Sequence, residues 1–67
     1  MSERFICTLK EHRQRMGFSQ DELAAMVNVR RETINRLEAG RYNPSLKLAV
    51  DISRAVATPI EELFIFY

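Results

Sequence analysis

The fold is decided by residues 19–39, whose sequence is SQDELAAMVNVRRETINRLEA. Ser19 is followed three positions later by Glu22, which is the capping-box arrangement that begins a helix, and the acids of this first turn complement the helix dipole. The apolar residues that follow recur at the spacing of one buried helix face: Leu23, Ala24 and Val27. The pattern predicts a helix over residues 20–26.

A second helix follows a short turn at Asn28, one of the few residue types other than glycine that tolerate a positive φ. We expect this helix to run from about Arg30 to Ala39 and to end at Gly40, with Ile34 and Leu37 turned inward. Its other faces carry long polar side chains. Two helices joined by a tight turn, the second with a polar outer face, form a helix-turn-helix unit, here residues 19–39.

Three more helices are predicted outside this unit. The first covers residues 8–16 and is closed by Gly17, and Ser45 caps the fourth. The fifth begins with Thr58 as N-cap and Pro59 in the first helical position, and it ends at Leu63 or Phe64. On the fourth helix the expected buried residues are Leu46, Ala49, Val50, Ile52, Ser53 and Val56. Met16 and Met26 are also expected in the core.

The two ends of the chain do not have a helical pattern. Residues 5–7 and 64–67 are β-branched and aromatic runs that a small domain would not usually leave exposed. We expect them to pair as a short two-stranded ribbon, although an extended tail or a dimer patch would leave the same pattern. The residues expected to make terminal-strand or dimer contacts are Phe5, Ile6, Leu63, Phe64, Ile65, Phe66 and Tyr67.

Composition restricts the possible functions of the chain. With 67 residues we expect a single domain over residues 1–67, of the marginal stability that favours a partner subunit. Cys7 and His12 are single residues of their types, which predicts neither a disulfide framework nor a Cys/His metal site. No long apolar run or secretion signal is evident, so we expect a cytoplasmic protein. No nucleophile, base and metal set supports an enzyme, and we expect no cofactor and no small-molecule ligand.

The net charge of +1 says little about nucleic acid, but its distribution is uneven. Residues 30–41 hold four arginines against two glutamates, a local charge of +2. A run of charge is usually only a solvated helix face. Within a helix-turn-helix pattern, however, arginine suits base and phosphate recognition better than solvation alone requires.

Three stretches of the chain resemble a known family: GFSQDELA at 17–24, VRRETI at 29–34 and LEAGRYNPS at 37–45. Together they are similar to the xenobiotic-response-element family of lambda-type phage repressors and Cro, over residues 8–64. The length and apolar ends also resemble the minimal single-domain repressors of the cytolysin-repressor kind. The resemblance implies an all-α, five-helix fold and a sequence-specific transcriptional repressor. It also implies a homodimer that binds a palindromic operator of double-stranded DNA, with residues 30–39 in the major groove, and hence association with the nucleoid.

The resemblance also implies roles for individual residues. Arg31, Glu32 and Arg36 match the positions that reach base edges, and Arg30 and Asn35 lie beside them; arginine can pair with guanine and glutamate can accept from cytosine N4. The positions that match phosphate contacts are Ser19, Gln20, Arg41 and Asn43. Glutamine often stands where Glu32 is, so Glu32 either reads a cytosine or holds a neighbouring arginine. Arg13 and Glu38 match an ion pair that ties the first helix to the end of the third.

One rival function comes from another class of protein. An antitoxin would combine a helix-turn-helix domain with a surface that masks a toxin and would also regulate its own synthesis through DNA. Such masking usually needs additional chain, and here only the last few residues are spare. Co-purification of a second small protein would favour this alternative.

Overall fold

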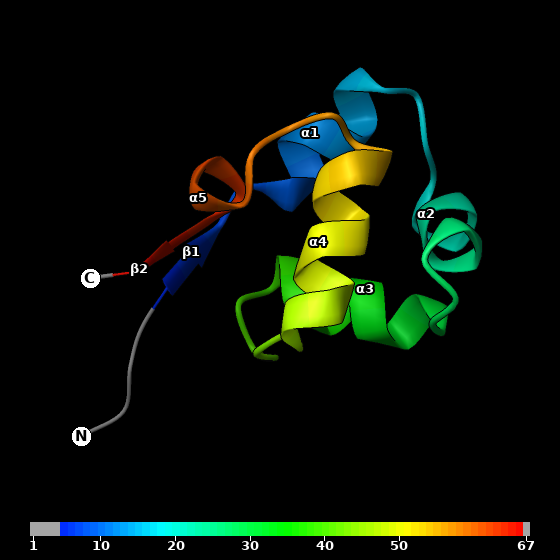
Figure 1. Ribbon diagram of the computed structural model, residues 1–67. Coiled ribbons are helices and arrows are strands. Elements are labelled where there is room, and N and C mark those ends of the chain that lie inside the picture. The colour runs from blue at the N-terminus through cyan, green and yellow to red at the C-terminus, as the bar shows by residue number, and fades with distance from the viewer. Residues whose placement is uncertain (1–4, 67) are drawn as a thin grey trace.

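The computed structural model describes residues 5–66 as a small helical bundle closed by a two-stranded ribbon (Figure 1). Its elements, in chain order, are β1 (Phe5–Cys7), α1 (Leu9–Arg15), α2 (Gln20–Met26), α3 (Arg31–Glu38), α4 (Leu46–Ala55), α5 (Ile60–Leu63) and β2 (Phe64–Phe66). Five helices were predicted, and the described residues contain five. α1 and α3 are each one residue shorter at both ends than expected, because the outermost residues serve as caps.

The helix-turn-helix unit forms as its sequence predicts. The Ser19 hydroxyl accepts a hydrogen bond from the Glu22 amide at 3.0 Å, and the Glu22 carboxylate accepts from the Ser19 amide at 2.8 Å, which completes the capping box. Asn28 adopts φ 60°, and the Val29 amide donates to the Ala24 carbonyl at 2.9 Å. This bond closes the turn and sends the chain from α2 into α3.

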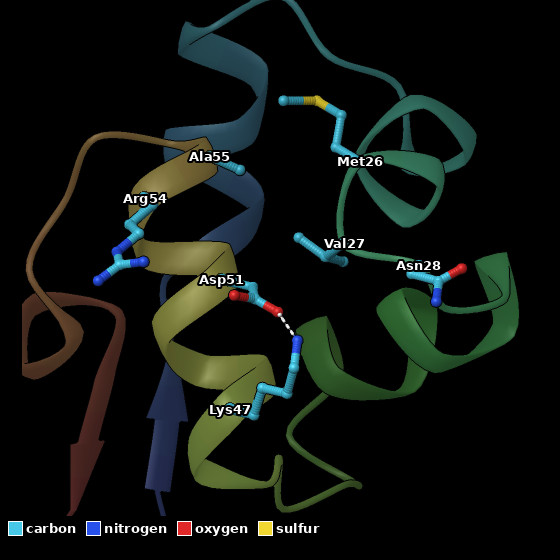
Figure 2. Close-up of a pocket in the computed structure, with 7 residues that line it drawn as sticks. All are labelled: Met26, Val27, Asn28, Lys47, Asp51, Arg54 and Ala55. Atoms are coloured by element: carbon cyan, nitrogen blue, oxygen red, sulfur yellow. Dashed lines mark hydrogen bonds and ion pairs between the residues drawn. The ribbon is translucent and has the colours of Figure 1, made fainter.

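α4 lies at the centre of the molecule, with α2 and α3 on one side and α5 with the ribbon on the other (Figure 1). A shallow hollow of about 440 Å³ separates the end of α2 from α4 (Figure 2). Met26 lines this hollow and is 52% exposed, so its predicted place in the core is wrong. Met16, the C-cap residue of α1, is 44% exposed, so its predicted place in the core is also wrong.

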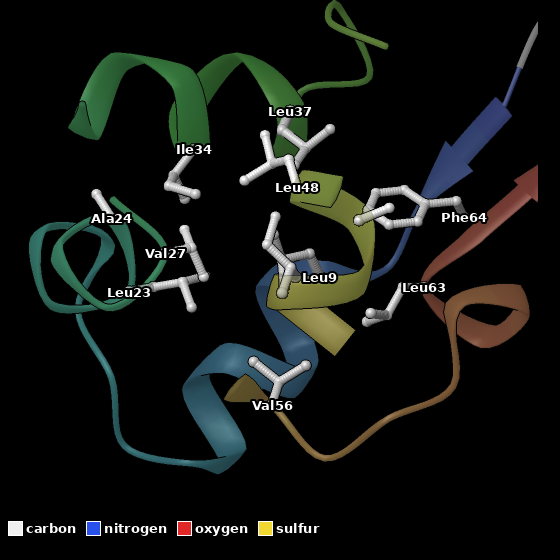
Figure 3. Close-up of a cluster of buried hydrophobic side chains, with 12 residues drawn as sticks. Leu9, Leu23, Ala24, Val27, Ile34, Leu37, Leu48, Val56, Leu63 and Phe64 are labelled. Carbon is white, nitrogen blue, oxygen red and sulfur yellow. The ribbon is translucent and has the colours of Figure 1, made fainter. Parts of the chain in front are cut away.

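The core brings apolar side chains from every helix to one cluster (Figure 3). Six of its residues are at most 2% exposed: Leu9, Leu23, Ile34, Leu37, Ile52 and Leu63. On α4 the buried stripe is Leu48, Ala49, Ile52 and Val56. The expectation for Leu46 is wrong: it is 77% exposed, because the stripe is centred near Ile52 and a residue six positions earlier points about 120° away from it.

The turn between α4 and α5 differs from the prediction. Thr58 does not cap α5; its hydroxyl donates to the Val56 carbonyl at 3.0 Å. α5 begins at Ile60, with Pro59 as the N-cap residue and no side-chain capping bond. The cause lies in Ala57, whose φ of 53° ends α4 and lets the Thr58 amide donate back to the Ser53 carbonyl at 3.0 Å. Thr58 therefore belongs to the end of α4.

The predicted terminal ribbon is present. β1 and β2 pair antiparallel, with Phe5 opposite Phe66, Ile6 opposite Ile65 and Cys7 opposite Phe64. Opposite residues of a ribbon share a face, so Ile6 and Ile65 point one way and the aromatic pairs point the other. Phe5 stacks on Phe66 with ring centroids 5.3 Å apart. Tyr67, expected to contribute, lies outside the described residues.

Candidate nucleic-acid interface

A buried ion pair joins α1 to the end of α3. Arg13 donates from Nε to Glu38 Oε2 at 2.6 Å and from Nη2 to Glu38 Oε1 at 3.2 Å. Its remaining Nη1 donates to the Phe18 carbonyl at 2.7 Å, in the loop before α2. The two side chains are 8% and 5% exposed. One guanidinium therefore joins α1 to the loop before α2 and to the end of α3, and the predicted pair is present.

Gln20 extends this network to α2. Its Nε2 donates to Glu38 Oε1 at 3.0 Å, so the carboxylate accepts from both α1 and α2. Within residues 5–66 no buried side-chain nitrogen or oxygen is left without a partner. The orientation of α3 is thus set by apolar contacts beneath it and by a fully bonded carboxylate at its end.

Three of the five predicted base-contacting residues lie on the exposed side of α3. Ile34 and Leu37 are 0% exposed and hold the helix against the core. The opposite side of the helix presents Glu32, Asn35 and Arg36, all exposed. Arg31 lies on the flank next to α2, where its Nε is 3.7 Å from Asp21 Oδ1. Both side chains of that pair are more than half exposed, so the contact is weak and leaves Arg31 able to reorient.

Two polar hollows border this exposed side of α3. One has a volume of about 280 Å³ and is lined by Arg30, Glu32, Thr33, Arg36 and Tyr42. The other has a volume of about 210 Å³ and is lined by Lys10, Gln20, Asn35, Glu38 and Ala39. Arg30 takes the N-cap position of α3 without a side-chain capping bond, and its side chain lines the first hollow.

The remaining predicted phosphate-contacting residues lie around the same helix. Ser19 is exposed and already serves as the cap of α2. Arg41 and Asn43 are exposed in the loop after α3, where the Arg41 amide donates to the Arg36 carbonyl at 2.9 Å and Gly40 has φ 72°. This turn fixes the backbone at Arg41 while its side chain points outward.

Lys10 and Tyr42 were missed as candidates although they line the two hollows. Lys10 precedes Arg13 by three positions, which places both on neighbouring parts of one helix face. That spacing could have identified Lys10 from the sequence as a neighbour of the predicted ion pair. Tyr42 had no such signal, because its position depends on the path of the loop.

The predicted terminal contacts divide into buried and exposed residues. Leu63 and Phe64 are at most 5% exposed and belong to the core, whereas Ile6, Ile65 and Phe66 are 50%, 43% and 55% exposed. Beside them an apolar hollow of about 210 Å³ is lined by Asn43, Pro44, Ala49, Ile60, Phe64 and Phe66. The ribbon is therefore both an element of the fold and an exposed apolar surface.

Other kinds of site are not evident in the described part of the chain. Within residues 5–66 no three His, Cys, Asp or Glu side chains gather as metal ligands. No helix of that range is long and apolar enough to span a membrane. Burial raises the pKa of the Cys7 thiol, an effect that a hydrogen bond with the Leu9 backbone partly offsets and the charge of Glu38 reinforces. Such a thiol is a poor nucleophile at neutral pH.

Comparison with known proteins agrees with this geometry. The family model described as helix-turn-helix matches residues 9–63. The chain is 55% identical over 58 residues to a helix-turn-helix-type transcriptional regulator of Archaeoglobus fulgidus, covering 87% of this chain and 83% of that protein. It is 43% identical over 56 residues to the regulator YgzD of Bacillus subtilis, covering 84% and 85% of the two chains.

Two solved structures are similar in fold as well. The restriction-modification controller protein C.AhdI of Aeromonas hydrophila has a TM-score of 0.75 at 32% identity, over 84% of this chain and 85% of that one. The clp gene regulator ClgR of Corynebacterium glutamicum has a TM-score of 0.74 at 26% identity, over 81% of this chain and 57% of that one. The chain therefore belongs to the Cro-like helix-turn-helix family of transcriptional regulators.

Proposed function

We propose that this protein is a sequence-specific DNA-binding repressor that places α3 in the major groove of a palindromic operator. The observation that carries the proposal is the attachment of α3: apolar residues and the buried carboxylate of Glu38 hold one side, while Glu32, Asn35 and Arg36 extend from the other. A helix presented in this rigid way can direct its side chains at base edges.

The predicted DNA contacts fall into two groups. Readers are residues at α3 that would contact base edges, and positioners are residues around α3 that would bind the sugar-phosphate backbone. Arg31 and Arg36 can each pair with guanine O6 and N7, and Glu32 can accept from cytosine N4 or hold Arg36, which lines the same hollow. Asn35 and Arg30 flank these readers. Ser19, Gln20, Arg41 and Asn43 surround the helix and would bind the sugar-phosphate backbone, which fixes register without reading sequence.

Dimerisation is part of the proposal and is supported by the exposed ribbon. Ile6 and Ile65 lie side by side in register on one face of the ribbon and are 50% and 43% exposed, and Phe66 on the other face is 55% exposed. Paired apolar residues on one face of a small domain are suited to a second copy of the same surface about a two-fold axis. Each copy would then offer one α3 to half-sites about 34 Å apart. A dimer of this kind, bound across a promoter, would exclude RNA polymerase.

Selection of bound sequences from a random duplex library tests this proposal. We expect an inverted repeat whose half-sites are separated by one helical turn, together with a dimer in sedimentation at micromolar concentration. Transcription from a promoter that contains the selected site should fall when the protein is added. Failure to enrich any sequence would contradict specific recognition, and a stable monomer that co-purifies with another small protein would favour an antitoxin role.

A further inference from the structure

Asp21 lies beside the reader Arg31 and belongs to neither of the two groups above. It is the second residue of α2, whereas Arg31 is the first residue of α3. The turn between the helices brings Asp21 Oδ1 to 3.7 Å from Arg31 Nε. Within residues 5–66 this is the only ion pair that either side chain forms. An acid of α2 therefore faces a predicted base-reading arginine and no other cation of the described chain.

The fold of α2 does not explain this acid. The capping box is completed by Glu22, whose carboxylate accepts from the Ser19 amide at 2.8 Å. The side chain of Asp21 is 79% exposed, and a surface ion pair of this kind adds little to stability. A carboxylate near DNA also repels phosphates. What Asp21 can change is the behaviour of the arginine that it faces.

The geometry of the contact leaves the tip of the guanidinium available. A guanidinium has five N–H donors arranged on two edges, one formed by Nε with one Nη group and the other by the two Nη groups. Asp21 makes its closest approach to Arg31 at Nε. The two Nη groups can then donate two parallel hydrogen bonds to guanine O6 and N7. A carboxylate on the Nε side would thus fix the plane of the guanidinium while its tip reads a base.

Water controls the strength of this ion pair. In the free protein the side chains of Arg31 and Asp21 are 58% and 79% exposed, so solvent screens their attraction. A major groove that covers α3 would remove much of this water and strengthen both the ion pair and the hydrogen bonds to the base. Arg31 is therefore free to reorient before binding and would be held in one orientation after it.

We propose that Asp21 is a specificity-determining residue that orients Arg31 toward one guanine and weakens binding to other sequences. At the correct base pair, the guanidinium satisfies Asp21 and guanine together. At an incorrect base pair the guanine is missing, and Asp21 competes with nearby phosphates for the arginine and repels them. The inference rests on the proposed DNA-binding function and deepens it, because it adds a residue that discriminates between sequences by acting through Arg31.

The test compares wild-type protein and Asp21→Asn on three duplexes. These are the selected operator, the operator altered at the base pair where Arg31→Ala relaxes the preference, and a duplex of random sequence. We expect Asp21→Asn to bind random duplex several-fold more tightly, because a repulsive charge is lost. Its preference for guanine at the altered base pair should fall roughly tenfold, with preferences at other base pairs unchanged.

Two further variants serve as controls. Asp21→Glu keeps the charge and should retain most of the preference for guanine. Asp51→Asn removes an acid from another surface ion pair, the one that Asp51 forms with Lys47 at 2.8 Å on α4 (Figure 2). This variant should leave the preference for guanine unchanged. Urea unfolding should show that all these variants remain folded with nearly wild-type midpoints.

A double-mutant cycle separates orientation of Arg31 from simple charge repulsion. In the Arg31→Ala background, Asp21→Asn should no longer alter the preference at that base pair, although it should still raise affinity for random duplex. If Asp21→Asn raises affinity for every sequence by the same factor, Asp21 acts only through its charge and the inference is wrong. If the preference falls to the same extent without Arg31, Asp21 acts on another residue. A wild-type protein that binds the three duplexes equally, or binds none of them, would overturn the proposed function itself.

Discussion

Arg13 and Glu38 stand 25 positions apart in the chain and meet in a two-point ion pair with its shorter contact at 2.6 Å. The pair is nearly withdrawn from solvent, and its carboxylate belongs to the last residue of α3. A buried pair of this kind adds little net stability compared with apolar residues of the same shape, but it strongly disfavours any arrangement that separates the charges. It therefore specifies where the recognition helix lies relative to α1.

Removing the carboxylate alone should be costly. Glu38→Ala leaves Arg13 buried without its partner, and we expect the free energy of unfolding to fall by about 3–5 kcal/mol in urea denaturation. The paired change Arg13→Met with Glu38→Leu should cost much less, because no uncompensated charge remains. Lys47→Ala breaks an exposed pair within α4 and should change stability by less than about 0.5 kcal/mol. A similar loss from Glu38→Ala and from Lys47→Ala would show that burial of the first pair has no energetic consequence.

Readers and positioners on α3 and its following loop should behave differently. Arg31→Ala should cost about 1–3 kcal/mol of operator binding and relax the preference at one base pair. Arg41→Ala should weaken binding to all sequences alike and flatten the salt slope by about one per contact. The measurement is a binding titration against the selected operator and its single-base variants at several salt concentrations. Identical profiles for the two variants would contradict the division.

Features carried by local chemistry were predictable from the sequence. The Ser19 and Glu22 capping box, the positive φ of Asn28 and the end of α3 at Gly40 all depend on residues a few positions apart, and the structure confirms each. The ribbon could also be predicted, because a small domain would not usually leave two short apolar runs exposed, and neither run has a helical pattern.

Features that depend on how helices pack could not be predicted in the same way. Leu46 fits the helical spacing of apolar residues, which predicts a position in the core. In the structure, α4 packs against Leu63 and the other helices with Leu48 buried and Leu46 exposed. Thr58 has the chemistry of a cap, but the turn at Ala57 assigns it to the preceding helix. At the candidate site, the resemblance identified residues one at a time, and only the geometry shows that Gln20 shares the carboxylate of Glu38.

The outward face of the ribbon should control assembly. Ile65 pairs with Ile6 on the side away from the aromatic residues, so Ile65→Lys removes exposed apolar surface without opening the core. We expect this variant to remain folded by circular dichroism, to sediment as a monomer and to lose affinity for the full operator far more than for a single half-site. Met26→Lys is the control, since Met26 is similarly exposed but lies on α2 beside α4. Dissociation by Met26→Lys and not by Ile65→Lys would place the interface on the other side of the molecule.

The Cys7 thiol should make stability depend on alkaline pH. The pKa of this thiol is raised in the folded protein chiefly by burial. In the unfolded chain the pKa is about 8.5. At a pH between these two pKa values, the unfolded state has released a proton that the folded state retains. The stabilisation is therefore present below about pH 8.5 and is lost as pH rises through the folded pKa. We expect urea midpoints of the wild-type protein to fall more steeply above that pH than those of Cys7→Ala, in which every other titrating group is unchanged. The difference between the two curves isolates the thiol, and parallel curves would show that Cys7 is as well solvated in the folded protein as in the unfolded chain.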